Sequence, residues 1–141
     1  MRNRHEQTFC SKLGKWWDNE GYKILGKGFY PVEAKISLDN KPFNFKSGLK
    51  PHQIPTLLKY QNDPMHWKIS DADTLSSKQY DLHFSHPLTT TSFIAIMWIR
   101  PRNKTFYLIN PKQIALLIEQ GHKSLTEVMA ESICDYKGEV R

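Results

Sequence analysis

Residues 92–109, SFIAIMWIRPRNKTFYLI, carry two short apolar runs on either side of a basic turn. The first run, 93–99, is apolar at every position, which is typical of a central strand that is covered on both faces. The second run, 105–109, follows closely after the turn, so we expect it to pair with the first as an antiparallel neighbour. The stretch therefore predicts the centre of a β-sheet.

Two helices are expected after this sheet centre. For the first, Asn110 is a predicted N-cap, Pro111 fits the first turn and Gly121 fits the end. The second is predicted to start at Ser124, because SLTE at 124–127 has the pattern of a capping box. Its expected packing residues are Leu125, Val128, Met129 and Ile133.

The N-terminal part predicts a helix and then a strand. Apolar residues at helical spacing predict an amphipathic helix that ends at Gly21, with a stripe of Phe9, Cys10, Leu13, Trp16 and Trp17. Residues 29–37, FYPVEAKIS, follow and alternate as in a strand. One face would carry Val32, Ala34 and Ile36, and the other Glu33, Lys35 and Ser37.

The middle of the chain predicts several shorter elements. A brief return strand is expected at 43–45, a helix starting near Gln53 in KPHQIPTLLKYQ, and strands at 66–70 and 79–84. The inward residues of that helix are expected to be Leu57, Leu58 and Tyr60. Together these elements predict one α/β domain over 1–141, with a mixed β-sheet flanked by helices.

Composition narrows the possible partners. The formal net charge of +6 favours polyanions, because a basic surface raises their local concentration. The longest apolar run is too short to cross a bilayer, and MRNRHEQTF lacks the apolar core of a signal peptide. The two cysteines, Cys10 and Cys134, match no zinc or redox spacing. We therefore expect no membrane partner and a cytoplasmic location.

The charged face of 29–37 allows two interpretations. Glu33 and Lys35 could be an ion pair on a solvated strand face, which is the commoner use of such a pair. They could instead be catalytic, because FNF, the basic segment KSGLK and His52-Gln53 at a helix start follow in order. A helix start can approach a phosphate with its free amides.

The segment VEAKIS…FNFKSGLKPHQIPTLL resembles the core of RecU-type Holliday-junction resolvases and related phage nucleases of the PD-(D/E)xK superfamily. The resemblance is firmest over 29–58, and weaker matches continue in WKISD, KQYD and TFYLIN. It implies a restriction-endonuclease-like fold and a homodimer in the cytoplasm of a bacterium or of a phage-infected host. It also implies Mg²⁺ as cofactor, with Mn²⁺ as a substitute, and DNA as substrate, in particular four-way junctions.

The same resemblance implies roles for individual residues. Glu33 would be a Mg²⁺ ligand, Lys35 would hold or activate the attacking water and offset charge on the phosphorane, and Gln53 would support both. Oxygen ligands of this kind suit Mg²⁺, which binds through one or two carboxylates and keeps several waters. The expected contacts to the DNA backbone are Lys27, Lys46, Lys50 and His52.

The chain departs from the RecU pattern at the second acidic ligand. That pattern has an aspartate on the strand before the Glu-x-Lys strand, whereas Asp18 and Glu20 here belong to the first helix. Asp81 in KQYD is the expected replacement, provided that its strand lies beside that of Glu33. Other candidates are Asp71 and Asp73, and Glu6 as an outer-sphere ligand.

The leading hypothesis is a Mg²⁺-dependent endonuclease that hydrolyses phosphodiester bonds in branched DNA. One alternative keeps the chemistry but acts on linear, nicked or single-stranded DNA. Another is a catalytically inactive DNA-binding or recombination accessory protein, which the absent aspartate favours.

Overall fold

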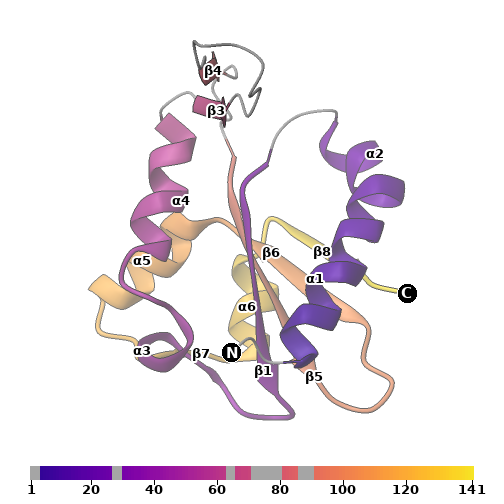
Figure 1. The fold of residues 1–141 in the computed structure, drawn as a ribbon. Coiled ribbons are helices and arrows are strands. Elements are labelled where there is room, and N and C mark those ends of the chain that lie inside the picture. The colour runs from indigo at the N-terminus through magenta and orange to yellow at the C-terminus, as the bar shows by residue number, and fades with distance from the viewer. Residues whose placement is uncertain (1–3, 27–29, 63–65, 71–80, 86–90) are drawn as a thin grey trace.

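The computed structural model describes the backbone of residues 4–26, 30–62, 66–70, 81–85 and 91–141, and the side chains of these residues except 62–90. Its main sheet is four-stranded, in the order β1-β5-β6-β8. β1 pairs in parallel with β5, and the other two pairings are antiparallel. The strands are β1 (Val32–Leu38), β5 (Phe93–Ile99), β6 (Thr105–Ile109) and β8 (Tyr136–Glu139). The protein is thus a mixed α/β structure (Figure 1).

The predicted sheet centre is confirmed. β5 lies between β1 and β6, and every residue from Phe93 to Trp98 is buried. β8, which closes the far edge by pairing with β6, was not predicted. Its sequence, YKGE, has too few apolar residues to show strand alternation.

One face of the sheet is covered by the N-terminal helical segment. It comprises α1 (Arg4–Trp16), the π-helical turn η1 (Trp17–Gly21) and α2 (Tyr22–Leu25). Phe9, Leu13 and Trp16 from α1 are buried against the sheet, where they meet Ala34, Phe93, Ala95, Met97, Phe106, Leu108 and Val140. The predicted stripe is therefore confirmed at these three positions, whereas Cys10 is exposed.

The prediction that this helix ends at Gly21 is wrong. The chain stays helical to Leu25 and turns at Gly26, which has a φ of 84°. Gly21 serves close packing instead: a Cβ atom built there would lie 2.7 Å from the ring of Trp16. The glycine is needed because a ring packs against its backbone, so it marks contact rather than termination.

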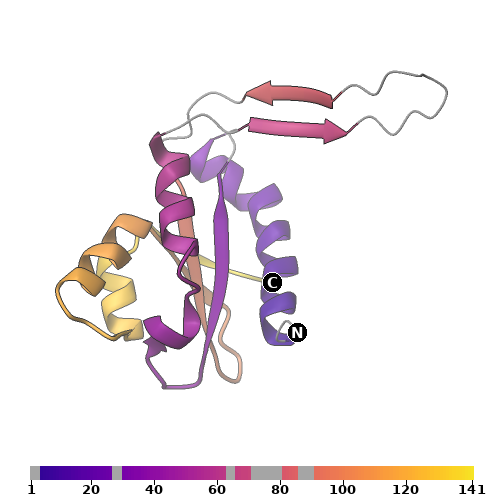
Figure 2. The same ribbon diagram turned by 60° about the vertical axis from the view of Figure 1, so that its left-hand side comes forward.

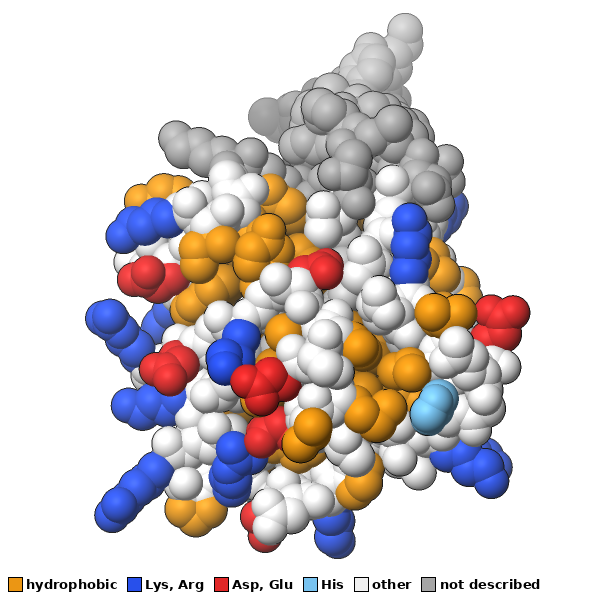
Figure 3. Space-filling view, turned by 180° about the vertical axis from the view of Figure 1, so that it is seen from behind, with side chains coloured by type: hydrophobic (Ala, Val, Ile, Leu, Met, Phe, Trp, Pro, Cys, Tyr) orange, Lys and Arg blue, Asp and Glu red, His pale blue; other side chains and the backbone are white. Residues whose placement is uncertain are grey.

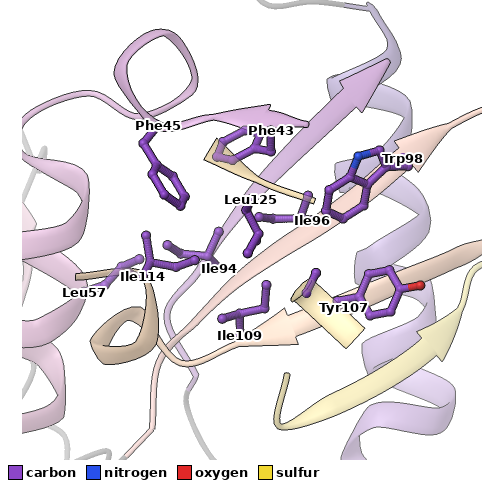
Figure 4. Packing of buried hydrophobic residues seen from close by; sticks show 11 residues of the cluster. Phe43, Phe45, Leu57, Ile94, Ile96, Trp98, Tyr107, Ile109, Ile114 and Leu125 are labelled. Atoms are coloured by element: carbon purple, nitrogen blue, oxygen red, sulfur yellow. The ribbon is translucent and has the colours of Figure 1, made fainter. Parts of the chain in front are cut away.

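The opposite face is covered by α4 (Gln53–Asn62), α5 (Pro111–Glu119) and α6 (Glu127–Ile133). A small antiparallel sheet of β2 (Phe43–Asn44) and β7 (Ser124–Leu125) lies on the same side, followed by the turn α3 (Phe45–Gly48). Figure 4 shows the resulting core, in which residues of these elements pack on Ile94, Ile96, Tyr107 and Ile109 of the sheet. The strand expected at 43–45 forms as β2, but it pairs with β7 and not with the main sheet.

Two of the helix predictions on this face are confirmed. α4 begins at Gln53, with Leu57 buried and with Leu58 and Tyr60 half-buried. α5 has Pro111 in its first turn, and the Asn110 side chain accepts a hydrogen bond from the Lys112 amide. Gly121, just past α5, has a left-handed φ of 92°.

The predicted start of the last helix at Ser124 is wrong. Ser124 lies in β7, and the N-cap is Thr126, whose hydroxyl accepts a hydrogen bond from the Met129 amide. Leu125, Met129 and Ile133 pack on the core as expected, but Val128 does not. Val128 is 78% exposed, and Ala130 is the fully buried residue.

The strands β3 (His66–Ser70) and β4 (Asp81–Ser85) pair with each other in an antiparallel sheet of their own. Figure 2 shows this pair extending past one end of the main sheet. The chain leaves the core after Gln61 and returns to it at Ser92. These two residues are in contact, since Gln61 Nε2 donates a hydrogen bond to Ser92 Oγ at 3.1 Å. No helix in the described ranges is long and apolar enough to cross a membrane.

Candidate functional site

An open groove of about 860 Å³ runs beside β1. The groove follows the free edge of β1 and is lined by residues from both faces of this strand, with α1 on one side and α3 and the start of α4 on the other. The polar lining residues are Glu6 and Cys10 from α1, Glu33 and Lys35 from β1, Ser47 from α3, and Lys50 and Gln53 next to α4. β1 is an edge strand of the main sheet, and Figure 1 shows α1 on one side of it and α3 and α4 on the other.

Lys35 is the buried member of the Glu33–Lys35 pair, whereas the Glu33 side chain is 34% exposed. Their side chains share one face of β1, and Lys35 Nζ lies 3.4 Å from Glu33 Oε1. Lys35 is only 8% exposed, and lysines are rarely buried to this degree without a partner. The sheet thus holds the Lys35 ammonium beside Glu33 at the floor of the groove.

Gln53 joins this pair from the start of α4. Its Nε2 donates to Glu33 Oε1 at 2.9 Å, and its Oε1 accepts from the Lys50 amide at 2.9 Å. The two bonds together fix which end of the side-chain amide points at Glu33. Three predicted site residues that are far apart in sequence therefore meet in one groove.

The strand that carries Asp81 is not a neighbour of β1 in the sheet. β1 pairs with β5 along its whole length, and Asp81 opens β4, which pairs with β3. The condition for Asp81 to take the second acidic position is therefore not met, because β4 pairs with β3 and not with β1. The Asp81 side chain lies outside the described residues, as do Asp71 and Asp73, so their roles stay predictions.

Glu6 lines the same groove as Glu33. It is half-buried and lies one helical turn before Cys10 on the flank of α1 that faces β1. Of the carboxylates considered for the second acidic position, Glu6 is the one that the described structure brings to the groove.

The predicted DNA contacts gather on the α3–α4 side. Lys50 lines the groove, and Lys46 and His52 are exposed in the adjoining α3 and the turn before α4. Lys27 lies outside the described residues.

Some groove residues were not predicted. Ser47 reaches the groove because Asn44 caps α3, accepting a hydrogen bond from the Ser47 amide at 3.0 Å. An asparagine before a short polar run is a cap signal, so this turn was open to prediction from sequence. Cys10 of α1 and Trp17 of η1 also line the groove, although the sequence placed both in the apolar stripe that packs on the core.

The donor set fits a hard divalent cation that keeps most of its water. Within the described residues, no three His, Cys, Asp or Glu side chains gather into a metal-binding group. Glu33 and Glu6 nevertheless offer carboxylate oxygens in a groove large enough for a hydrated ion. Mg²⁺ is bound in this way, through one or two carboxylates with water and substrate phosphate, whereas a caged ion needs more ligands.

Comparison of the chain with protein-family models, with curated proteins and with solved structures gave no match.

Proposed function

We propose that this protein is a Mg²⁺-dependent endonuclease that hydrolyses phosphodiester bonds in DNA, with four-way junctions as its substrate. The observation that carries the proposal is the meeting of Glu33, Lys35 and Gln53 in one open groove, with Lys35 buried. This is the residue set that the resemblance to RecU-type resolvases implies. A restriction-endonuclease-like core, lacking the strand that precedes β1 in that family, is part of the same proposal.

Each residue has a role that its environment supports. Glu33 presents a carboxylate to the groove, and Gln53 holds it in place through one amide hydrogen bond. Lys35 supplies a positive charge that can orient an attacking water and offset the charge that develops on the phosphate. Its burial keeps water from screening that charge, so the interaction is stronger than at an exposed lysine.

A bound Mg²⁺ would polarise the phosphate and favour an ionised water near neutral pH. Glu33 would hold the ion, with Glu6 as the second carboxylate in place of the aspartate that the RecU pattern puts on the preceding strand. Glu6 suits this position because its helix forms one side of the groove.

The substrate and assembly follow from the resemblance together with the basic charge. Lys46, Lys50 and His52 on the α3–α4 side would contact phosphates, giving affinity and salt dependence without reading sequence. Paired cuts in a junction need two active sites, so we propose a homodimer in a bacterial or phage-infected cytoplasm.

A second candidate function is a DNA-binding accessory protein without catalysis. It is favoured by the absence, among the described residues, of a group of three potential metal-ligating side chains. The two functions differ in whether DNA is cut when Mg²⁺ or Mn²⁺ is added.

The test is cleavage of a labelled synthetic four-way junction with Mg²⁺, compared with linear, nicked and single-stranded DNA. Lys35→Met keeps the apolar stem and removes the charge, so we expect a loss in cleavage rate of about a hundredfold or more. Lys59→Met, at an exposed position on α4, is the matched control and should cleave normally. Equal cleavage by wild type and Lys35→Met would show that the groove is not the active site. Binding in EDTA without cleavage in either metal would favour the accessory protein.

A further inference from the structure

α1 has a second exposed flank, and it borders a basic groove. This cavity of about 260 Å³ lies between the N-terminal helices and the end of β8. Four cationic side chains, Lys12, Lys15, Lys23 and Arg141, line it together with two carboxylates, Glu20 and Glu139. Figure 3, viewed from behind, shows Lys and Arg side chains along the rim of the molecule where α1 and α2 lie.

The lysines form a continuous row. Lys12 and Lys15 are neighbours on the surface of α1, because residues three apart lie on the same side of a helix. Lys23 extends the row, since the chain stays helical through η1 into α2. All three side chains are exposed, and within the described residues none of them takes part in an ion pair.

This row lies across α1 from the candidate active site. Glu6, Cys10 and Gly14 line the active-site groove, whereas Lys12 and Lys15 line the basic one. A helix with its side chains is about 10–12 Å wide, and phosphates in one DNA strand follow each other at about 3.4 Å along the axis. A backbone held at Lys35 has to pass around α1, a path of about 16–19 Å, and would therefore reach the basic groove after about five or six nucleotides.

We propose that Lys12, Lys15 and Lys23, with Arg141, form a second contact for the nucleic-acid backbone. The inference rests on the proposed function, because it concerns the DNA that the candidate active site would hold. A row of exposed lysines matches an extended chain of phosphates. A single small anion would need buried donors converging on one point. Glu20 and Glu139 moderate the attraction, so removing their charges should strengthen it.

The test measures DNA affinity without cleavage. Fluorescence anisotropy of a labelled four-way junction is recorded in EDTA over about 50 to 200 mM KCl. The triple variant Lys12→Gln, Lys15→Gln, Lys23→Gln is compared with Lys59→Gln, Lys112→Gln, Lys123→Gln, which removes the same charge from exposed lysines elsewhere. The first variant should lower the slope of log affinity against log salt by about 3, or about 1 for each lost phosphate contact. The control should keep the wild-type slope.

A second variant, which removes negative charges from the same groove, should change the DNA affinity in the opposite direction. Glu20→Gln with Glu139→Gln should tighten binding by up to about fivefold, the range expected for exposed charges.

The outcomes separate this inference from the proposed function. If both lysine variants lose the same slope, the second contact is overturned while the nuclease assignment stands. If the slope changes as expected but wild type cleaves nothing, the contact stands and the nuclease is overturned. If wild type binds no DNA but sediments with anionic phospholipid vesicles, both are overturned and the row is a membrane contact.

Discussion

Lys35 belongs both to the sheet and to the groove. Its main chain pairs with Ile96 of β5, and its ammonium reaches Glu33 Oε1. Burying a lysine is unfavourable unless its charge has a partner. A buried, paired lysine in a groove is therefore a candidate functional residue. Gln53 completes the arrangement by linking Glu33 to the start of α4.

At Gln53 we predict a role in positioning. Gln53→Leu keeps a similar volume and removes both hydrogen bonds, so Glu33 loses its fixed orientation. We expect junction cleavage with Mg²⁺ to slow by about tenfold to a hundredfold, as for other residues that orient a metal ligand. Gln113→Leu, at an exposed site on α5, is the control. A Gln53 variant as fast as this control would contradict the role.

We predict that replacing Asp135 by asparagine raises the stability of the protein, and that the gain depends on pH. Asp135 lies at the surface, but partial desolvation by its neighbours raises the pKa of its carboxyl above the ordinary value, so the folded state binds the proton slightly more tightly than the unfolded state does. Stability is then lost as pH rises through the range between the unfolded and folded pKa. Asp135→Asn should raise Tm at pH 7 and leave it unchanged near pH 3, where the carboxyl is protonated in both states. Thermal unfolding at the two pH values checks this, and an equal shift at both would argue against the titration of Asp135.

At the scale of elements, helix boundaries depend on which residue makes the cap. SLTE at 124–127 has two hydroxyl residues that could cap a helix, and sequence spacing alone favours the first. Pairing of Ser124 with Asn44 in the small sheet makes Ser124 extended, which leaves Thr126 to cap α6. The same holds for Gly21, which sequence spacing predicts as a helix end. Its role is instead to let the ring of Trp16 pack against the backbone.

The cap of α6 gives a direct comparison between these two hydroxyl residues. Thr126→Ala should lower the free energy of unfolding by about 1 kcal/mol, since the Met129 amide loses its acceptor. Ser124→Ala should cost clearly less, because within the described residues the Ser124 hydroxyl makes no capping bond. Urea denaturation of both variants measures the difference. Equal losses would place the cap elsewhere.

At the scale of the whole molecule, the β3–β4 pair is an addition to a complete sheet. Gln61 and Ser92 are both buried and hydrogen-bonded to each other where the chain leaves and returns, and Ser92 also donates to the Leu57 carbonyl. Both core clusters lie on the faces of the main sheet. The hairpin is therefore expected to be dispensable for folding.

Replacing residues 64–89 by a short Gly-Ser loop should preserve the fold, because the ends already meet and a shorter loop closes at lower entropic cost. It also removes Asp71, Asp73 and Asp81. If Glu33 and Glu6 hold Mg²⁺, the cation should still raise Tm, by about 4 °C at about 10 mM for a dissociation constant of about 1 mM. Differential scanning calorimetry with Mg²⁺ or KCl at matched ionic strength tests this.

Two controls make this experiment decisive. Glu33→Gln in the shortened protein should abolish the Mg²⁺ shift, because it removes the central carboxylate. If wild type shows the shift and the shortened protein does not, the second ligand is in the hairpin, and Asp81 regains its predicted role.

The sequence by itself determined the elements whose pattern is local. The apolar run 93–99, the capped helix at 110–121 and the Glu-Ala-Lys alternation on β1 all form as expected, because each depends on side chains within a few residues of one another. Glu33, Lys35 and Gln53 were also predicted as candidate site residues, and the structure brings their side chains together.

Only the tertiary structure decided the rest, because those features depend on partners distant in the chain. Pairing of β4 with β3 placed the strand of Asp81 in a separate sheet from Glu33, and the packing of α1 on the main sheet brought Glu6 to the groove. The same packing turned the other flank of α1 toward the end of β8, where Lys12 and Lys15 meet Arg141. Local periodicity carries no information about such contacts, which arise only when the buried faces of separate elements are brought together.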